Sequence, residues 1–199
     1  MYKYYSQVTI SESKIIPAST MKIGFDLDKV FVDYPPLIPD RLIDKLYKKK
    51  SNGVLLYRMP SRPEQFIRQL SHLPILRPPI KTNINFLCSL PKDKHELYLI
   101  SSRFGFLEKQ TLSLMTRLGL DSVFTRMYFN FENKQPHLFK DEVLRQLKLD
   151  LYIDDDLALL KYVAQRNNAT KFYWFHQGPF TLTLPKNVMK INKLSEITL

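Results

Sequence analysis

The chain has 199 residues, of which 44% are hydrophobic and 13% aromatic. This length suits one compact α/β domain with a modest insertion, and this composition excludes an intrinsically disordered chain. A single cysteine, Cys88, excludes an intramolecular disulfide framework, and the formal net charge of +11 favours anionic ligands.

Residues 1–20 precede the first clear secondary-structure pattern and lack the apolar core of a signal peptide. They are an extension, a mis-assigned start or an extra edge element, and the sequence leaves these alternatives open. The following run MKIGFDLD, residues 21–28, is apolar and then turns into two acids. This pattern predicts a buried first strand that leads into carboxylates.

Residues 34–80 break this pattern with eight prolines and two short helical patterns, at 41–49 and 63–70. We interpret them as a small cap insertion in a core domain made of residues 21–33 and 81–199. Basic side chains of the insertion are candidates to contact anionic parts of a substrate. These candidates are the run from Arg41 to Lys50 and, further along, Arg58, Arg62 or Arg68.

Strand and helix patterns alternate through the remaining chain. Strands are expected at 95–103, 122–130, 150–156, 171–176 and 187–191, and helices at 105–119, 137–149 and 157–168. Gly119 is expected to end the first of these helices, and Leu138, Val143, Leu144 and Leu147 to form the apolar face of the second. The alternation predicts an α/β fold with a Rossmann-like, mostly parallel sheet and helices on both faces.

Polar residues follow three of the expected strands, and in an open parallel sheet such strand ends meet in one crevice. Asp26 can attack phosphorus as a carboxylate nucleophile and form an aspartyl phosphate. Asp28, two residues later, can protonate the leaving oxygen and afterwards deprotonate water. Taken alone, this acid pair also fits a solvated strand end or a helix cap.

A carboxylate repels phosphoryl oxygens, so such a site needs a hard cation, for which Mg²⁺ is the usual choice. Asp154, Asp155 and Asp156 are candidate ligands of this cation. Burying three adjacent acids without a cation would be costly, because their negative charges repel one another. Ser101 and Ser102, with the N-terminus of the following helix, can bind phosphoryl oxygens. Lys140 can offset the negative charge of these acids. By themselves, Ser101 also fits a helix cap and Lys140 a surface lysine.

Four motifs, FDLDKV, LYLIS, FKDEVL and LYIDDD, follow one another in an order that resembles the haloacid dehalogenase superfamily. The resemblance implies that Asp26 is nucleophile and metal ligand, and that Asp28 is the acid/base and binds metal through its backbone carbonyl. It also implies that Asp155 binds metal directly, and that Asp154 lies behind the direct ligands or reaches the metal through water. The resemblance leaves the role of Asp156 open. Lys134 is an alternative to Lys140 as the lysine of the third motif. Lys29 and Val30 stand where many members of the superfamily have Gly-Thr.

These features predict a cytoplasmic Mg²⁺-dependent phosphatase for a small phosphorylated metabolite or nucleotide. The cap position resembles that of nucleotidase-like members. Alternatives are a phosphatase for nucleic-acid ends or phosphoproteins, which the positive charge would suit, and a catalytically silent binding module of the same fold. No apolar run approaches the roughly 20 residues that span a membrane, so no membrane partner is expected.

Overall fold

The computed structural model describes residues 20–35, 48–51 and 54–199, so the expected extension lies outside it except for Thr20. Six parallel strands form one sheet in the order β5-β4-β1-β6-β7-β8. They are β1 (Met21–Phe25), β4 (His95–Ser101), β5 (Arg126–Phe129), β6 (Leu151–Asp154), β7 (Lys171–Phe175) and β8 (Val188–Ile191). The predicted Rossmann-like parallel sheet is confirmed.

The central strands are apolar on both sides because both faces of the sheet are covered. In β4, Leu97 and Leu99 join one buried cluster, while Tyr98 and Ile100 join another on the opposite face. This alternation follows from the two-residue period of a strand. The runs of consecutive apolar residues in the sequence therefore mark strands that are buried on both faces.

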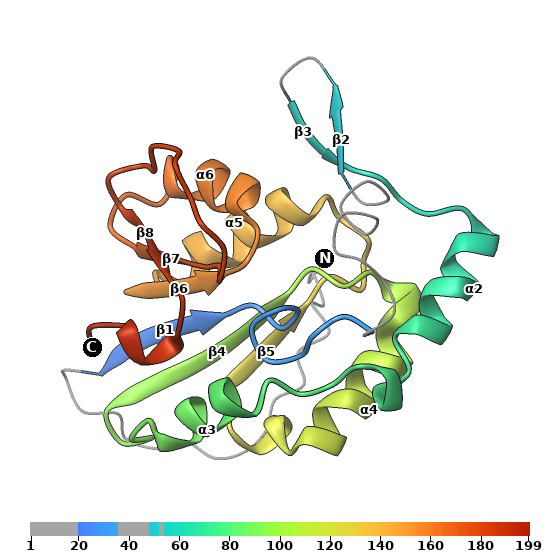
Figure 1. Cartoon of the computed structure of the whole chain (residues 1–199), viewed down its shortest axis with the longest axis horizontal. Coiled ribbons are helices and arrows are strands. Elements are labelled where there is room, and N and C mark those ends of the chain that lie inside the picture. Colours follow the sequence, from blue (N-terminus) through green and yellow to red (C-terminus); the bar gives the residue numbers. More distant parts are fainter. Residues whose placement is uncertain (1–19, 36–47, 52–53) are drawn as a thin grey trace, which may run out of the picture.

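Helices cover both faces of the sheet, as predicted (Figure 1). The helices α3 (Lys81–Ser89) and α4 (Glu108–Leu118) pack on one side, and α5 (Pro136–Leu147) and α6 (Leu157–Ala164) pack on the other. Gly119 ends α4 in the left-handed conformation, with φ of 66°, as its position predicted. Pro136 starts α5, where the missing proline N–H costs no helical hydrogen bond.

The structure differs from the sequence-based expectations at three places in the core. The strand expected at 122–130 begins only at Arg126, because Leu120–Ser122 forms a short 3-10 turn. The helix α3 was missed because its few apolar residues follow directly on a proline-rich segment. Leu138 is 48% exposed although its neighbours on the expected face, Val143 and Leu144, are buried.

The segment between β1 and β4 carries a hairpin of β2 (Lys48–Ser51) and β3 (Val54–Tyr57), followed by α2 (Arg62–Ser71). The helix expected at 63–70 is confirmed and starts with a capping box of Ser61 and Glu64. The helix expected at 41–49 is wrong at residues 48 and 49, which lie in β2, and its other residues lie outside the described part. The domain limits stay a prediction.

The strand order of the sheet reverses at β1. From β1 the chain fills one side of the sheet with β4 and β5, and then the other side with β6, β7 and β8. Such a reversal opens a crevice beyond the carboxyl ends of β1 and β6. Within the described residues, no helix combines the length and the apolar character that crossing a membrane requires.

Candidate active site

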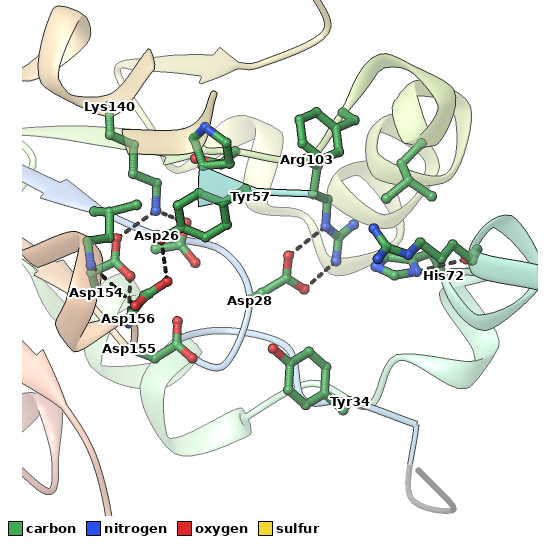
Figure 2. A pocket seen from close by; sticks show the side chains of 16 residues that line it. Asp26, Asp28, Tyr34, Tyr57, His72, Arg103, Lys140, Asp154, Asp155 and Asp156 are labelled. Atoms are coloured by element: carbon green, nitrogen blue, oxygen red, sulfur yellow. Dashed lines mark hydrogen bonds and ion pairs between the residues drawn. The ribbon is translucent and has the colours of Figure 1, made fainter. Parts of the chain in front are cut away.

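A pocket of about 150 Å³ lies beyond the carboxyl ends of the central strands (Figure 2). Acids line one end, and a basic wall of Arg68, His72 and Arg103 lines the other. Figure 2 shows Asp28 between these two ends. The crevice anticipated from the strand order is therefore the place where the predicted catalytic residues gather.

Three carboxylates form an acidic cluster, defined by Asp26, Asp154 and Asp155. Asp26 directly follows β1, and its backbone N–H donates to the carbonyl of Ile153 at 2.9 Å, which ties the end of β1 to β6. One carboxylate oxygen from each acid lies within 4.8 Å of the others. Several carboxylate oxygens in one place suit a hard cation such as Mg²⁺, so the residues fit the predicted metal.

Lys140 is buried in α5 and bridges two members of the acidic cluster. Its Nζ donates to Asp26 Oδ1 at 2.7 Å and to Asp154 Oδ2 at 2.6 Å. The alternative lysine, Lys134, instead forms an ion pair with Glu142 at 2.8 Å. The structure thus places Lys140, and not Lys134, beside the predicted nucleophile.

Electrostatic strain remains in the acidic cluster despite Lys140. Burial raises the pKa of Asp26 to about 7; Lys140 opposes this shift and Asp154 reinforces it. Burial, together with the charges of Asp154 and Asp26, raises the pKa of Asp155 well above its usual value. A bound divalent cation would reverse both shifts, because it favours the ionised carboxylates.

Asp154 is the most enclosed acid of the cluster, with no exposed surface. Besides Lys140, it accepts hydrogen bonds from the Tyr152 hydroxyl at 2.8 Å and from the Asp156 N–H at 2.9 Å. These donors fix the carboxylate in one orientation. Asp155 has more open surroundings on the pocket wall, which is compatible with its predicted role as a direct ligand.

Asp156, whose role the sequence left open, caps the start of α6. Its Oδ1 accepts from the N–H groups of Ala158 and Leu159, while its Oδ2 accepts from the Tyr57 hydroxyl at 2.7 Å. A capping carboxylate of this kind stabilises a helix start. Asp156 therefore joins α6 to the end of β3, and Tyr57 is a pocket residue that sequence reasoning missed.

Asp28 faces the basic end of the pocket. Arg103 donates to both of its carboxylate oxygens, from Nε to Oδ2 and from Nη2 to Oδ1, each at 2.8 Å, and Arg77 also pairs with Oδ1. Burial acts to raise the pKa of this carboxyl, but Arg103 and Arg77 hold it well below its usual range. The predicted acid/base role therefore requires Asp28 to exchange these partners.

The loop after β1 turns without glycine because Lys29 itself adopts the left-handed conformation, with φ of 60°. This conformation is unfavourable for residues with a side chain. The Lys29 N–H donates to the Val32 carbonyl at 2.7 Å, and its Nζ pairs with Asp33 at 2.7 Å. The Asn83 side chain, on α3, donates to the Val30 carbonyl at 2.7 Å and thereby connects the loop to α3.

Of the two predicted phosphate-binding serines, Ser102 lines the pocket. Ser101 is the last residue of β4 and is buried, and its Oγ accepts a long hydrogen bond, 3.5 Å, from the Arg103 N–H. The Ser102 hydroxyl is buried and has no hydrogen-bond partner among the described residues. A buried hydroxyl in that condition is a candidate donor to a ligand.

The basic residues of the insertion that were candidates for substrate contact lie in different surroundings. Arg68 lines the pocket, Arg58 pairs with Glu64, and Arg62 is exposed. The side chains from Arg41 to Lys50 lie outside the described part. Sequence reasoning missed His72, although a signal existed: the spacing of four residues from Arg68 puts both on one helical face.

Comparison with known proteins adds evidence on the fold. No protein-family model and no curated protein sequence matches the chain. A putative β-phosphoglucomutase from Thermotoga maritima superposes with a TM-score of 0.52 and 18% identity, over 89% of this chain and 96% of that one. A hydrolase of the haloacid dehalogenase (HAD) superfamily from Ehrlichia chaffeensis gives a TM-score of 0.52 and 11% identity, over 89% and 94%.

This chain has a HAD-like fold. Its HAD-like motifs are the ones that the structure gathers: FDLD after β1, the serines at the end of β4, Lys140 in α5 and the acids after β6. Identities this low show the fold and leave the reaction to be argued from the site itself.

Proposed function

We propose that this HAD-like chain is a Mg²⁺-dependent phosphatase that hydrolyses a phosphomonoester through an aspartyl phosphate on Asp26. The observation that carries the proposal is the acidic cluster at the ends of β1 and β6, bridged by buried Lys140. A nucleophilic carboxylate, further acids for a cation and a fixed positive charge are the groups that phosphoryl transfer requires.

In the first step, an oxygen of Asp26 attacks phosphorus as the ester P–O bond breaks. The leaving oxygen takes a proton from Asp28, which must first exchange its arginine partners and take up that proton from solvent. In the second step, Asp28 takes a proton from water, the water oxygen attacks phosphorus, and the Asp26 carboxylate is released with inorganic phosphate. Lys140 holds Asp26 Oδ1 throughout and thereby orients the nucleophile.

Asp26, Asp154 and Asp155 would hold the Mg²⁺, with the Asp28 backbone carbonyl as a further ligand. When bound, the cation supplies the positive charge that lets a carboxylate approach phosphoryl oxygens. Ser102 would donate its buried hydroxyl to one of these oxygens. Ser101 contributes by placing Ser102 at the end of β4.

The pocket of about 150 Å³ has room for a phosphoryl group and a small part of its carrier, so we favour a small phosphorylated metabolite, or the phosphate end of a nucleotide in a nucleotidase-like role, as the substrate. A second candidate is a phosphatase for nucleic-acid ends, which the net charge of +11 favours. Salt separates the two, because polyanion binding weakens steeply with ionic strength and small-substrate turnover does so far less. A cytoplasmic location remains a prediction.

The test is a screen of phosphorylated metabolites and nucleotides, with Mg²⁺ present and with Mg²⁺ chelated. Wild type should release phosphate only with the metal, and Asp26→Asn should lose turnover while it stays folded. The matched control is Asp93→Asn, which removes the same charge at an exposed position and should keep full activity.

A binding readout should accompany the screen. Mg²⁺ should raise the Tm of wild type, because an ion that binds the folded state stabilises it, and Asp155→Asn should lose most of that shift. Turnover that survives both Asp26→Asn and chelation would contradict the proposal. A well-folded wild type without turnover on any substrate class would favour the silent binding module.

A further inference from the structure

The turn from Asp154 to Asp156 is held in place at each of its three residues. The donors described above fix the Asp154 carboxylate, the Asp155 backbone carbonyl accepts from the Trp174 indole N–H at 2.8 Å, and the Asp156 carboxylate accepts from the Tyr57 hydroxyl. The Asp155 carboxylate itself accepts no hydrogen bond from the described residues. This acid, the predicted direct metal ligand, is therefore positioned through the backbone on either side of it.

Tyr57 reaches this turn from the insertion and not from the core sheet. It is the last residue of β3 and is buried. Its backbone N–H donates to Gln135 Oε1 at 2.9 Å, and Gln135 Nε2 donates to its carbonyl at 3.1 Å. Gln135 directly precedes α5, the helix that carries Lys140. The reciprocal pair of hydrogen bonds thus fixes the backbone of Tyr57 against the start of α5.

The ring of Tyr57 is held by aromatic packing. It stacks on the His137 ring, with centroids 6.1 Å apart and planes inclined by 27°. The His137 ring in turn meets Tyr162, on α6, edge-on at 4.7 Å. Figure 2 shows Tyr57 on the acidic side of the pocket, with the hydrogen bond from its hydroxyl to Asp156. With its backbone and its ring both held, Tyr57 loses little further freedom when its hydroxyl binds Asp156.

Asp156 passes this constraint on to the metal-binding acids. Its Oδ1 caps α6 by accepting from two backbone N–H groups, while its Oδ2 accepts from Tyr57. Its own backbone N–H donates to Asp154 Oδ1 at 2.9 Å. Asp156 is therefore held at its side chain and at its backbone, and Asp155 lies between two fixed residues.

We propose, on the basis of the proposed Mg²⁺-dependent function, that Tyr57 is a positioning residue for the cation site. Through Asp156 it sets the orientation of Asp155, so that the hairpin of β2 and β3 raises the affinity for Mg²⁺. Residues that hydrogen-bond a metal ligand directly change metal affinity by about 10- to 100-fold. Because Tyr57 acts one residue further from the metal, we expect its hydroxyl to contribute about 3- to 10-fold.

Calorimetric titration of Mg²⁺ into wild type and Tyr57→Phe tests this role. Phenylalanine keeps the packing on His137 and the backbone pair with Gln135, and it lacks only the hydroxyl. The Kd for Mg²⁺ should rise about 3- to 10-fold. The matched control is Tyr162→Phe, which removes a hydroxyl that makes no hydrogen bond with Asp156, from the same aromatic group, and should keep the wild-type Kd.

Turnover of an accepted phosphomonoester gives a second readout, which a merely structural contact would not change. In Tyr57→Phe the Mg²⁺ concentration for half-maximal rate should rise by the same factor as the Kd, and kcat at saturating Mg²⁺ should return to near its wild-type value.

Should Tyr57→Phe fold poorly, Gln135→Ala provides an independent variant. It removes the partner of the Tyr57 backbone without removing a side-chain hydrogen bond that caps α5, and it should weaken Mg²⁺ binding in the same direction.

The outcomes distinguish this inference from the proposed function. An unchanged Kd in Tyr57→Phe, or an equal rise in Tyr162→Phe, would overturn the role of Tyr57 and leave the phosphatase intact. Turnover that does not depend on Asp26, together with the expected rise in Kd, would remove the phosphatase and support the positioning role. Wild type that binds no Mg²⁺ would overturn both.

Discussion

At the scale of single residues, Lys140 shows how strongly the site depends on charge balance. Its ammonium group is buried between Asp26 and Asp154, at 2.7 and 2.6 Å. Burial acts to lower its pKa, but Asp154 and Asp26 raise it well above its usual value, so the lysine is charged. In isolation such a residue resembles any helical lysine, and only the surrounding acids show its importance.

Replacing Lys140 with methionine should destabilise the protein by about 3 kcal/mol when divalent cations are chelated, because two buried carboxylates lose their counter-ion. Mg²⁺ should restore part of that loss. Urea unfolding of Lys140→Met with and without Mg²⁺ measures both effects. Lys109→Met, at an exposed position on α4, is the control and should change stability by less than about 0.5 kcal/mol. Equal stability of Lys140→Met and wild type in chelator would refute this expectation.

His72 should make stability depend on pH. Its pKa is about 3 in the folded protein against 6.5 ordinarily, so the unfolded chain binds a proton first as the pH falls. The stabilisation due to neutral His72 is therefore complete above pH 6.5 and is lost as the pH drops toward 3. Between these values the loss amounts to at most about 1.4 kcal/mol per pH unit.

Chemical unfolding of wild type and His72→Gln at several pH values between about 4 and 6 measures this contribution. The free energy of unfolding should fall more steeply with decreasing pH in wild type than in His72→Gln. The other titrating groups are present in both proteins, so the difference in slope reports on His72. Parallel pH dependences would show that His72 takes up its proton equally readily in the folded and unfolded states.

At the scale of helices and strands, glycine at the end of α4 offers the cleanest test of backbone conformation. Gly119 has φ of 66°, and an added Cβ would meet no atom within 4 Å. Gly119→Ala should therefore cost about 1 kcal/mol through backbone strain alone. Gly119→Asn should cost less, because asparagine tolerates this conformation. Thermal unfolding compares them, and an alanine variant as stable as wild type would contradict the assignment.

The secondary structure of the core could be predicted because its signals are local. Apolar runs that end in acids or serines marked β1, β4 and β6, and helical spacing marked α4, α5 and α6. The strand β2 could not be predicted, because a run of lysines has little strand propensity and its pairing with β3 depends on the fold. Tertiary contacts decided the conformation there.

At the scale of the whole molecule, the site joins residues far apart in the chain. Asp26 and Asp154 could be identified because motifs at the ends of strands meet at one edge of a parallel sheet, and Lys140 because the motif FKDEVL resembles one of the HAD superfamily. The pairing of Asp28 with Arg103 and that of Tyr57 with Asp156 could not. These contacts depend on how the segment between β1 and β4 folds over the pocket, which no local pattern specifies.

The placement of α2 illustrates this limit. Its buried residue is Arg68, while Phe66 and Ile67 are 62% and 64% exposed. The helix thus turns a polar face toward the pocket, the reverse of what an amphipathic pattern ordinarily indicates. Recognising the basic wall from sequence would have required knowing that this helix borders a binding site and not the core.

The most direct test of the central claim is to stop a single turnover with acid, digest the protein and locate any bound phosphoryl group by mass spectrometry. Wild type with Mg²⁺ and an accepted phosphomonoester should carry the phosphoryl group on Asp26, in a linkage that hydroxylamine cleaves, and Asp26→Asn should carry none. Rapid release of phosphate with no phosphoryl group on Asp26, or with one on another residue, would contradict the account.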